Sequence, residues 1–218
     1  AKAIDALSAT VPISSIALAA PTGKAAVRLT ELLAGHGIHK RAHTLHKLLG
    51  FDGDGFTFHR RNQWAFRVLI IDEFSMVPVG LLRAVLDAVP PGCHVLFVGD
   101  VQQLAPVGHG APLRDFIAAG VSHGELTEIQ RNAGGIVEVC HAIRNGSDWE
   151  PHDNLTLGCS GAEGMLRTVV ELGKDCDPIW DVQAIVGSND KGDLSRELLN
   201  KALQAELNAT GESHADWP

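Results

Sequence analysis

The chain has 218 residues, of which 45% are hydrophobic and 20% charged, and its formal net charge is −8. These values are typical of a soluble globular protein and leave room for one α/β domain, or for one domain and part of another. No apolar run approaches the roughly 18 residues of a membrane helix. The negative charge argues against a surface that is basic throughout, as in many nucleic-acid-binding proteins, although a single groove can still be basic.

The cysteines and the first residues of the chain indicate the cellular compartment in which we expect the protein. The cysteines are widely spaced and form no C-x-x-C pair, so we expect free thiols in a reducing cytosol; they are Cys93, Cys140, Cys159 and Cys176. The chain opens without Met and without a basic segment, so we expect no signal peptide. We therefore expect a cytoplasmic protein with no membrane partner, and a sequence that is a piece of a longer chain.

Strands and helices are predicted to alternate. In chain order we expect a helix at 1–8, a strand at 15–20, a helix at 24–33, one or two helical turns at 43–49, a hairpin at 51–59, a strand at 68–72, a helix at 78–89, a strand at 93–98, a helix at 111–119, a strand at 124–129 and a helix at 136–144. After a polar segment at 147–164 we expect strands at 165–172 and 181–186 and a helix at 194–207. The alternation indicates a parallel α/β sheet flanked by helices.

Two acids end the first strongly apolar strand. Asp72 and Glu73 follow the run Val68–Ile71 directly. Buried strands that deliver polar groups at their C-terminal ends are typical of the site edge of an open parallel sheet. In nucleotide hydrolases of this layout the first acid holds Mg²⁺ and the second orients the attacking water. The alternative is a pair of acids that merely solvates the end of a strand.

A second polar loop follows the next strand along the chain. Gly99 and Asp100 end the run Val95–Val98, and Gln103 and Pro106 come shortly after. Glycine lets the backbone turn close to a ligand, and the Asp and Gln side chains can reach a phosphate or the attacking water. The alternative is an ordinary strand-to-loop turn. The position of this loop one strand–helix unit after the acid pair favours the phosphate-binding interpretation.

The segment Pro21-Thr22-Gly23-Lys24 connects the predicted strand at 15–20 to a helix. It lacks the leading glycine and the Ser/Thr after Lys that define the phosphate loop G-x-x-x-x-G-K-[ST], and that loop occurs nowhere in the sequence. A helix N-terminus with a hydroxyl can still bind a phosphate of a single strand or of a nucleotide. A plain helix cap is the alternative.

Further candidates are less specific. Arg131 follows a predicted strand and could clamp a γ-phosphate, or form a surface salt bridge. His43 and His46 have the spacing of a metal pair without an evident third ligand, so a helix that faces a groove is the favoured alternative. A similar choice, between stacking on bases and packing a hairpin, holds for three aromatic residues, Phe56, Phe58 and Trp64.

The order of these motifs resembles superfamily 1 DNA helicases of the RecD-like branch, which move 5′→3′ on single-stranded DNA and act in DNA repair and recombination. The similarity covers about residues 1–209, and Ala105 stands where the family usually has Pro. The matching segments are residues 20–29 (motif Ia), 43–50, 70–77 (motif II), 99–108 (motif III), 126–132, 181–186 and 198–204. Each motif alone is moderately specific, whereas their order and spacing together are highly specific.

The resemblance implies ATP and Mg²⁺ as ligands and gives each candidate a role. Asp72 would bind Mg²⁺, Glu73 would activate water, and Gln103 would sense the γ-phosphate and couple it to DNA. Arg131 would be an arginine finger, and Asp100 would lie at the nucleotide. The residues implied on the single-stranded-DNA side are Pro21, Thr22, Gly23, Lys24, His43 and His46. The other partners implied are subunits of a helicase–nuclease complex, although a conjugation relaxase or a stand-alone helicase fits equally well.

The fold implied is the RecA-like parallel sheet of P-loop NTPases. The first motor domain would occupy 1–146, a crossing segment 147–164, and the start of a second RecA-like domain 165–218. In the family the phosphate loop and its strand precede a helix like the one at 1–7. We therefore expect a sheet that is incomplete at its N-terminal side, and a chain that is poorly stable and inactive as an ATPase by itself.

Two other interpretations stay open. The chain could be a non-catalytic protein that has lost its phosphate loop and keeps a nucleic-acid or partner-binding role. It could also belong to another class of P-loop NTPase, such as an AAA-type ATPase. The Gly99-Asp100-x-x-Gln103 loop and the segment Pro21–Ala26 favour the helicase.

Overall fold

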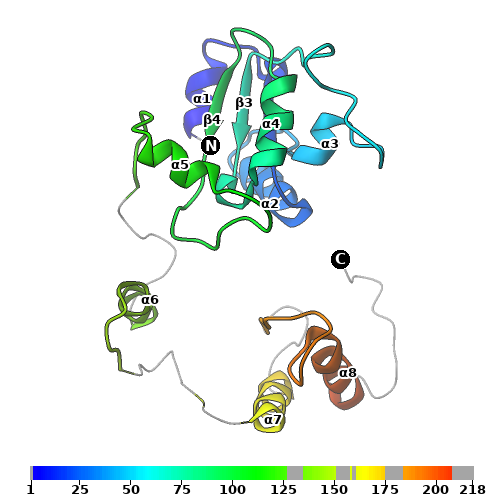
Figure 1. Ribbon diagram of the computed structural model, residues 1–218, viewed down its shortest axis with the longest axis vertical. Coiled ribbons are helices and arrows are strands. Elements are labelled where there is room, and N and C mark those ends of the chain that lie inside the picture. Colours follow the sequence, from blue (N-terminus) through cyan, green and yellow to red (C-terminus); the bar gives the residue numbers. More distant parts are fainter. Residues whose placement is uncertain (1, 127–134, 151–157, 159–160, 175–183, 208–218) are drawn as a thin grey trace. The chain divides into compact units, whose positions relative to one another are not determined.

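The computed structural model describes residues 2–126, 135–150, 158, 161–174 and 184–207 (Figure 1). The chain forms two compact units, residues 1–126 and residues 127–218. This division falls earlier than the linker predicted at 147–164. The assignment of two motor domains stays a prediction.

A four-stranded parallel sheet forms the centre of the first unit. Its strands, in spatial order, are β2 (His43–Thr44), β1 (Ile16–Ala20), β3 (Val68–Ile71) and β4 (His94–Phe97). β1 and β3 are buried along their whole length, as expected for inner strands of a parallel sheet. The predicted parallel α/β sheet is therefore confirmed.

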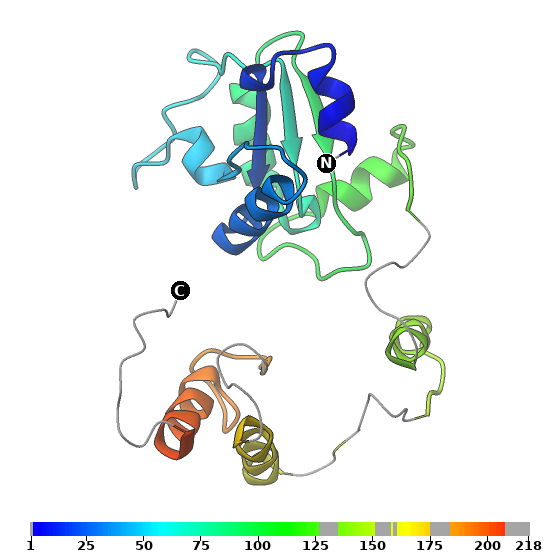
Figure 2. The same cartoon turned by 180° about the vertical axis from the view of Figure 1, so that it is seen from behind.

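Helices cover both faces of this sheet. Side chains of β1 and β3 alternate between the faces, so each strand supplies both halves of the core. One face packs against α1 (Lys2–Ser8) and α2 (Gly23–Ala34) through Ile16, Leu18, Ala20, Val68 and Ile70. The other packs against α3 (Leu45–Leu49), α4 (Val79–Ala88) and α5 (Pro112–Ala118) through Ala17, Ala19, Leu69 and Ile71. Figure 1 shows α4 in front of the sheet, and Figure 2, from behind, shows α1 and α2.

Threonine side chains begin two of these helices. The Thr22 hydroxyl oxygen accepts a hydrogen bond from Ala25 N at 3.3 Å, and the Thr44 oxygen accepts one from Lys47 N at 3.2 Å. Each satisfies a backbone donor that the first helical turn leaves free. Gly50, with φ 69°, ends α3 in the left-handed conformation that glycine adopts most easily.

Three aromatic residues after α3, namely Phe56, Phe58 and Trp64, pack against the core. Residues 51–62 form a pair of short antiparallel bridges, Phe51 to Phe56 and His59 to Asn62, which confirms a hairpin-like segment. Trp64 is buried, and its indole N–H donates to Leu48 O at 3.0 Å. Phe56 and Phe58 are partly buried against the same core. The packing interpretation of these three rings is therefore confirmed.

The regular elements described in the second unit are helices. It contains α6 (Gly135–Asn145), α7 (Ala162–Lys174) and α8 (Arg196–Leu207), of which α6 and α8 confirm predicted helices. α7 and α8 pack closely, because a Cβ at Gly173 would lie 2.7 Å from Leu207 Cδ1.

The strand predicted at 165–172 is wrong, since these residues lie within α7. The inward positions Leu166, Val169, Val170 and Gly173 are spaced by three or four residues, which is helical spacing. The apolar pairs Met165–Leu166 and Val169–Val170 resemble a strand only if the polar residues Arg167 and Thr168 between them are ignored.

Two other predicted strands are wrong as far as they are described. Residues 124–126 and 184–186 are irregular, and the rest of those predictions, 127–129 and 181–183, lies outside the described residues. In the part of the chain that the structure describes, no helix is long and apolar enough to cross a membrane. Cys93 and Cys140 are free thiols, as predicted, and burial raises the pKa of the Cys93 thiol.

Candidate functional site

The predicted site residues follow strands whose C-terminal ends meet at one edge of the sheet. Ile71 is in register with Ala19 on one side and with Phe97 on the other, and Ala20 is in register with Thr44. The residues that follow these strands are therefore side by side: Thr22 after β1, Asp72 and Glu73 after β3, and Asp100 after β4. Ligands of open parallel sheets bind outside this edge.

The loop that carries the acid pair is hydrogen-bonded to both neighbouring strands. Asp72 N donates to Ala19 O at 2.9 Å, and Phe74 N donates to Val98 O at 2.8 Å. The ring of Phe74 is buried and stacks on Phe97, with the ring centroids 4.1 Å apart. These contacts fix the backbone on both sides of Glu73, which is the requirement for a catalytic group that must be held in one place.

Glu73 has an unusual backbone conformation. Its φ is 52°, and it is the only described residue other than glycine with a positive φ. A side chain in this left-handed region costs roughly 1–3 kcal/mol and persists where the surrounding structure imposes it, often at functional sites. The strain turns the chain from β3 into the 3₁₀ turn Phe74–Met76 and leaves Glu73 half-buried at the sheet edge.

The acid pair suits a Mg²⁺ ion that is shared with phosphates. Asp72 Oδ1 accepts a hydrogen bond from Glu73 N at 3.0 Å, so the second oxygen of this carboxylate is left for a ligand. Among the described residues no group of three His, Cys, Asp or Glu side chains could hold a metal ion. Mg²⁺ usually takes one or two carboxylates, with waters and substrate phosphates as its other ligands, so a single well-placed Asp is sufficient.

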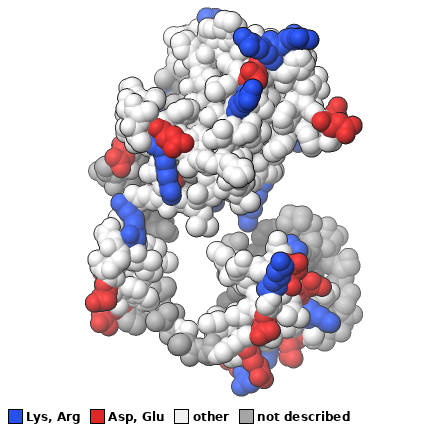
Figure 3. Space-filling view, in the orientation of Figure 1, with Lys and Arg blue, Asp and Glu red and all other residues white. Residues whose placement is uncertain are grey.

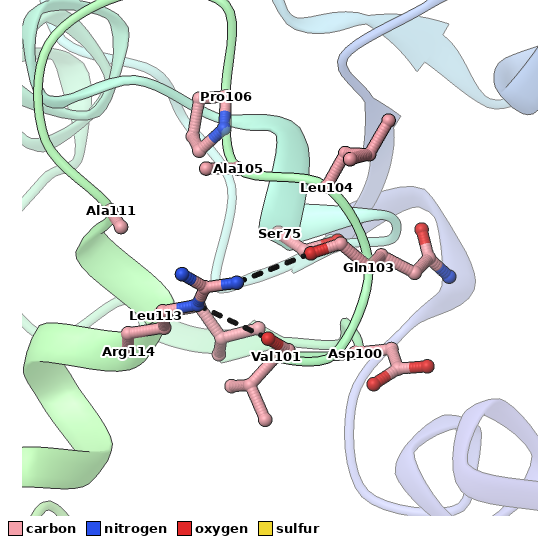
Figure 4. Close-up of a pocket in the computed structure, with 10 residues that line it drawn as sticks. All are labelled: Ser75, Asp100, Val101, Gln103, Leu104, Ala105, Pro106, Ala111, Leu113 and Arg114. Atoms are coloured by element: carbon pink, nitrogen blue, oxygen red, sulfur yellow. Dashed lines mark hydrogen bonds between the residues drawn. The ribbon is translucent and has the colours of Figure 1, made fainter. Parts of the chain in front are cut away.

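The loop after β4 comes close to the acid-pair loop. A Cβ on Gly99 would lie 2.8 Å from Ser75 N and 2.9 Å from Leu113 Cδ2, so only glycine fits between them. The Asp100 carboxylate accepts from Gln102 N at 2.9 Å and so shapes the turn itself. Gln103 is exposed, and Figure 4 shows its side chain and that of Asp100 extending away from Arg114.

The segment after β1 acts as a helix cap and leaves its other polar groups accessible. The Thr22 oxygen already caps α2, as the alternative interpretation supposed. Gly23 and Lys24 are exposed at the first turn of this helix, and Pro21 is half-buried before it. A cap of this kind is compatible with a phosphate at the same helix end, because the hydroxyl proton and further N–H groups remain.

The two histidines do not form a metal site with any third described ligand. His46 is exposed on α3 and makes an edge contact with Phe51, with ring centroids 5.8 Å apart. His43 is half-buried in β2. Burial lowers the pKa of His43, and the positive charges of Lys47, Arg41 and Lys40 lower it further.

Charge is unevenly divided along the chain. Residues 1–126 carry 11 Lys and Arg against 10 Asp and Glu, whereas residues 127–218 carry 7 against 16. The negative net charge therefore belongs to the second part of the sequence and says little about the sheet edge. On the face drawn in Figure 3 the Lys and Arg side chains are dispersed rather than gathered in one patch.

Two arginines, Arg131 and Arg114, differ in what the sequence and the structure say of them. Arg131, the predicted arginine finger, lies outside the described residues, so its position stays a prediction. Arg114 was not predicted, although it donates hydrogen bonds to the loop after β4. The sequence pattern does not identify this contact, because it depends on how α5 packs beside the loop after β4.

Comparison with known proteins identifies similar chains. The model of a family described as an AAA domain matches residues 2–109. An ATP-dependent RecD2 DNA helicase of Deinococcus radiodurans is 35% identical over 196 residues, which cover 88% of this chain and 26% of the relative. The RecD subunit of the RecBCD enzyme of Mycolicibacterium smegmatis is 39% identical over 153 residues, or 62% of this chain and 27% of the relative.

Among solved structures, Bacteroides Pif1 bound to single-stranded DNA is 24% identical, with a TM-score of 0.39, and the match covers 92% of this chain and 47% of that one. The chain thus spans about a quarter of the length of the two curated relatives, 26% and 27%.

Proposed function

Because this chain belongs to the RecD-like branch of the superfamily 1 DNA helicases, we propose that it supplies the catalytic acids and part of the DNA surface of an ATP-dependent DNA helicase. The observation that carries the proposal is the acid pair itself. Glu73 is held in a strained conformation at the sheet edge, beside the loop of Gln103. Strain of this kind is expected where a side chain must point at a reacting group.

In this proposal the residues of β3 and β4 serve ATP hydrolysis. Asp72 holds Mg²⁺, which neutralises charge on the β- and γ-phosphates when it is bound. Glu73 accepts a proton from the attacking water, and Gln103 and Asp100 face the phosphates from the neighbouring loop. Arg131 supplies positive charge to the γ-phosphate as an arginine finger.

The residues of β1 and β2 serve single-stranded DNA. Thr22, Gly23 and Lys24 bind a backbone phosphate at the N-terminus of α2, and Pro21 sets the turn that exposes them. His43 and His46 line the next position along the edge. The support for this division is the strand order, in which β1 and β2 lie on the opposite side of β3 from β4.

The finer parts of the proposal follow the family. The motor moves 5′→3′ on single-stranded DNA in the cytoplasm, with ATP and Mg²⁺, and it serves repair and recombination alone or with the subunits of a helicase–nuclease complex. The 218-residue chain by itself does not hydrolyse ATP at a helicase-like rate, because it has no G-x-x-x-x-G-K-[ST] loop to hold the phosphates.

The first experiment is to read the coding DNA upstream of Ala1 and to express the longer chain. We expect an in-frame phosphate loop within roughly 20 residues, and ATP hydrolysis that single-stranded DNA stimulates. Glu73→Gln should reduce the turnover about 100-fold or more while ATP still binds, since it removes the base and keeps the shape. Unrelated sequence upstream, or ATPase activity in the 218-residue chain, contradicts the proposal.

A direction assay completes the test. Unwinding of duplexes with a 5′ single-stranded overhang, and not of those with a 3′ overhang, is the expected result for the longer chain. The opposite preference refutes the proposed polarity and leaves the assignment of the acid pair intact.

A further inference from the structure

The loop that carries Gln103 is attached to the first unit at widely separated points. At its start, Gly99 lies against the backbone of Ser75. At its end, His109 O accepts a hydrogen bond from Val79 N at 3.0 Å. Between these points residues 102–105 are exposed, with Leu104 at 90%, and packing against the unit resumes at the buried Pro106.

Arg114 of α5 is hydrogen-bonded to the loop between these two points. Its Nε donates to Val101 O at 3.1 Å, and its Nη2 donates to Gln103 O at 3.4 Å (Figure 4). Within the described residues these are the only hydrogen bonds that join residues 100–105 to another element. The turn's other bonds, Gln102 N to the Asp100 carboxylate and Gln103 N to Asp100 O, are internal.

A small cavity lies between the loop and the body of the unit. Its volume is about 10 Å³, which is the room of roughly one water molecule. Ser75 lines it, and the buried Ser75 hydroxyl has no hydrogen-bond partner. The packing beneath the loop is therefore incomplete at this place, and the hydrogen bonds of Arg114 hold the turn at Val101 and Gln103 to α5.

We propose that Arg114 is a positioning residue that fixes the turn bearing Gln103. The planar guanidinium donates to both carbonyls at once, whereas a lysine ammonium on a flexible stem cannot reproduce that paired geometry. The inference rests on the proposed function, in which Gln103 senses the γ-phosphate. Arg114 itself touches no reacting atom in this scheme; it acts through the backbone of Gln103.

The first test uses the 218-residue chain and needs no activity. Backbone ¹⁵N order parameters are measured for Gln102, Gln103 and Phe74 in the wild type and in Arg114→Met, which keeps the aliphatic stem. We expect the values at Gln102 and Gln103 to fall from about 0.85, typical of rigid backbone, to below about 0.6. Phe74, bonded to Val98, should stay rigid, which separates loop release from unfolding.

The second test uses the longer, ATP-hydrolysing chain. We expect Arg114→Met to lower kcat of DNA-stimulated hydrolysis about tenfold with KM for ATP nearly unchanged, as for loss of one or two charge-assisted hydrogen bonds. Arg114→Lys should recover part of the loss. Adding Arg114→Met to Gln103→Ala should cause no further decrease, because both changes remove the same contribution. Arg83→Met, at an exposed arginine of α4, is the control.

The outcomes of the two tests are separable. Unchanged order parameters at Gln103 in Arg114→Met overturn the inference whatever the enzyme does. A mobile loop together with an unchanged kcat also overturns it, because Arg114 then fixes the turn without serving hydrolysis. If the longer wild-type chain has no ATPase, the proposed function fails, and the order parameters alone decide whether Arg114 holds the turn.

Discussion

At the scale of single residues, the positive φ of Glu73 leads us to expect a difference in stability between two substitutions at this position. Glycine adopts a φ of 52° without the steric penalty that any β-carbon meets. We expect Glu73→Gly to have a free energy of unfolding about 1 kcal/mol higher than Glu73→Ala, because alanine keeps the strain and glycine releases it. Urea denaturation of the two variants measures the difference.

Both Glu73 variants should lose hydrolysis in the longer chain, since neither has a carboxylate. A more stable and inactive Glu73→Gly protein is the pattern expected when strain has been retained for function. An alanine variant as stable as the glycine variant would falsify the assignment of strain.

The environment of His43 predicts how stability depends on pH. Its pKa is lowered in the folded chain from the ordinary 6.5, first by burial and then by nearby Lys47, Arg41 and Lys40. The unfolded state thus binds more protons below pH 6.5, so stability falls as the pH drops from that value toward the lowered pKa. We expect His43→Gln to flatten this part of the stability–pH curve.

His39→Gln is the matched control for the pH experiment, because His39 is an exposed neighbour in the sequence. Chemical denaturation between about pH 7 and pH 5 covers the range in which an unperturbed histidine changes charge. Equal pH dependence in His43→Gln and wild type contradicts the role assigned to His43.

At the scale of elements, the approach of the two site loops is set by Gly99. A methyl group there would lie 2.8 Å from Ser75 N and 2.9 Å from Leu113 Cδ2. We expect Gly99→Ala to destabilise the chain by about 1–3 kcal/mol, the usual cost of overpacking, and to displace the Gln103 loop. Gly80→Ala in α4 is the control, since nothing lies within 4 Å of its added carbon.

The two glycine substitutions should have opposite signs. Gly80 is the second residue of α4 and its added carbon meets no neighbour, so alanine there is expected to stabilise by about 0.4–1 kcal/mol, chiefly by restricting the unfolded chain. Thermal denaturation of both variants is sufficient. A neutral Gly99→Ala variant contradicts the close packing of the loops.

The sequence was most informative where a short apolar run lies between turn residues. β3 and β4 are predicted to within a residue at either end, because runs of this length favour a strand over a helix. α7 was assigned as a strand because its apolar pairs hid the helical spacing. The position of Asp72 and Glu73 at a strand end was predictable, whereas the strain at Glu73 and the contact of Arg114 depend on tertiary packing.

At the scale of the whole chain, β4 exposes part of an apolar face. It is an edge strand of the described sheet, and Leu96 and Val98 are 42% and 43% exposed on its surface and at its end. Exposed apolar edge strands associate readily with other chains. We expect the purified chain to be poorly stable and to self-associate, as sedimentation velocity and a broad melting transition would record.

Leu96→Lys should reduce this association, because a charged side chain on an edge strand disfavours pairing. Leu86→Lys is the matched control, since Leu86 is 50% exposed on α4, away from the strand. A sharp melt of a monomeric wild-type chain contradicts the prediction. So does an equal effect of the two lysine substitutions.

The strand order also sets a length. Neighbouring strands lie about 4.8 Å apart, so the three intervals from β2 to β4 span about 14 Å along the edge. Backbone hydrogen bonds keep these intervals constant, so the proposed DNA-side residues after β2 and β1 and the proposed nucleotide-side residues after β3 and β4 occupy adjacent halves of this span. A sheet with this fixed spacing does not stretch when a ligand binds beside β4. In the proposed motor we therefore expect movement where the strands continue into their loops, with the sheet as a rigid base.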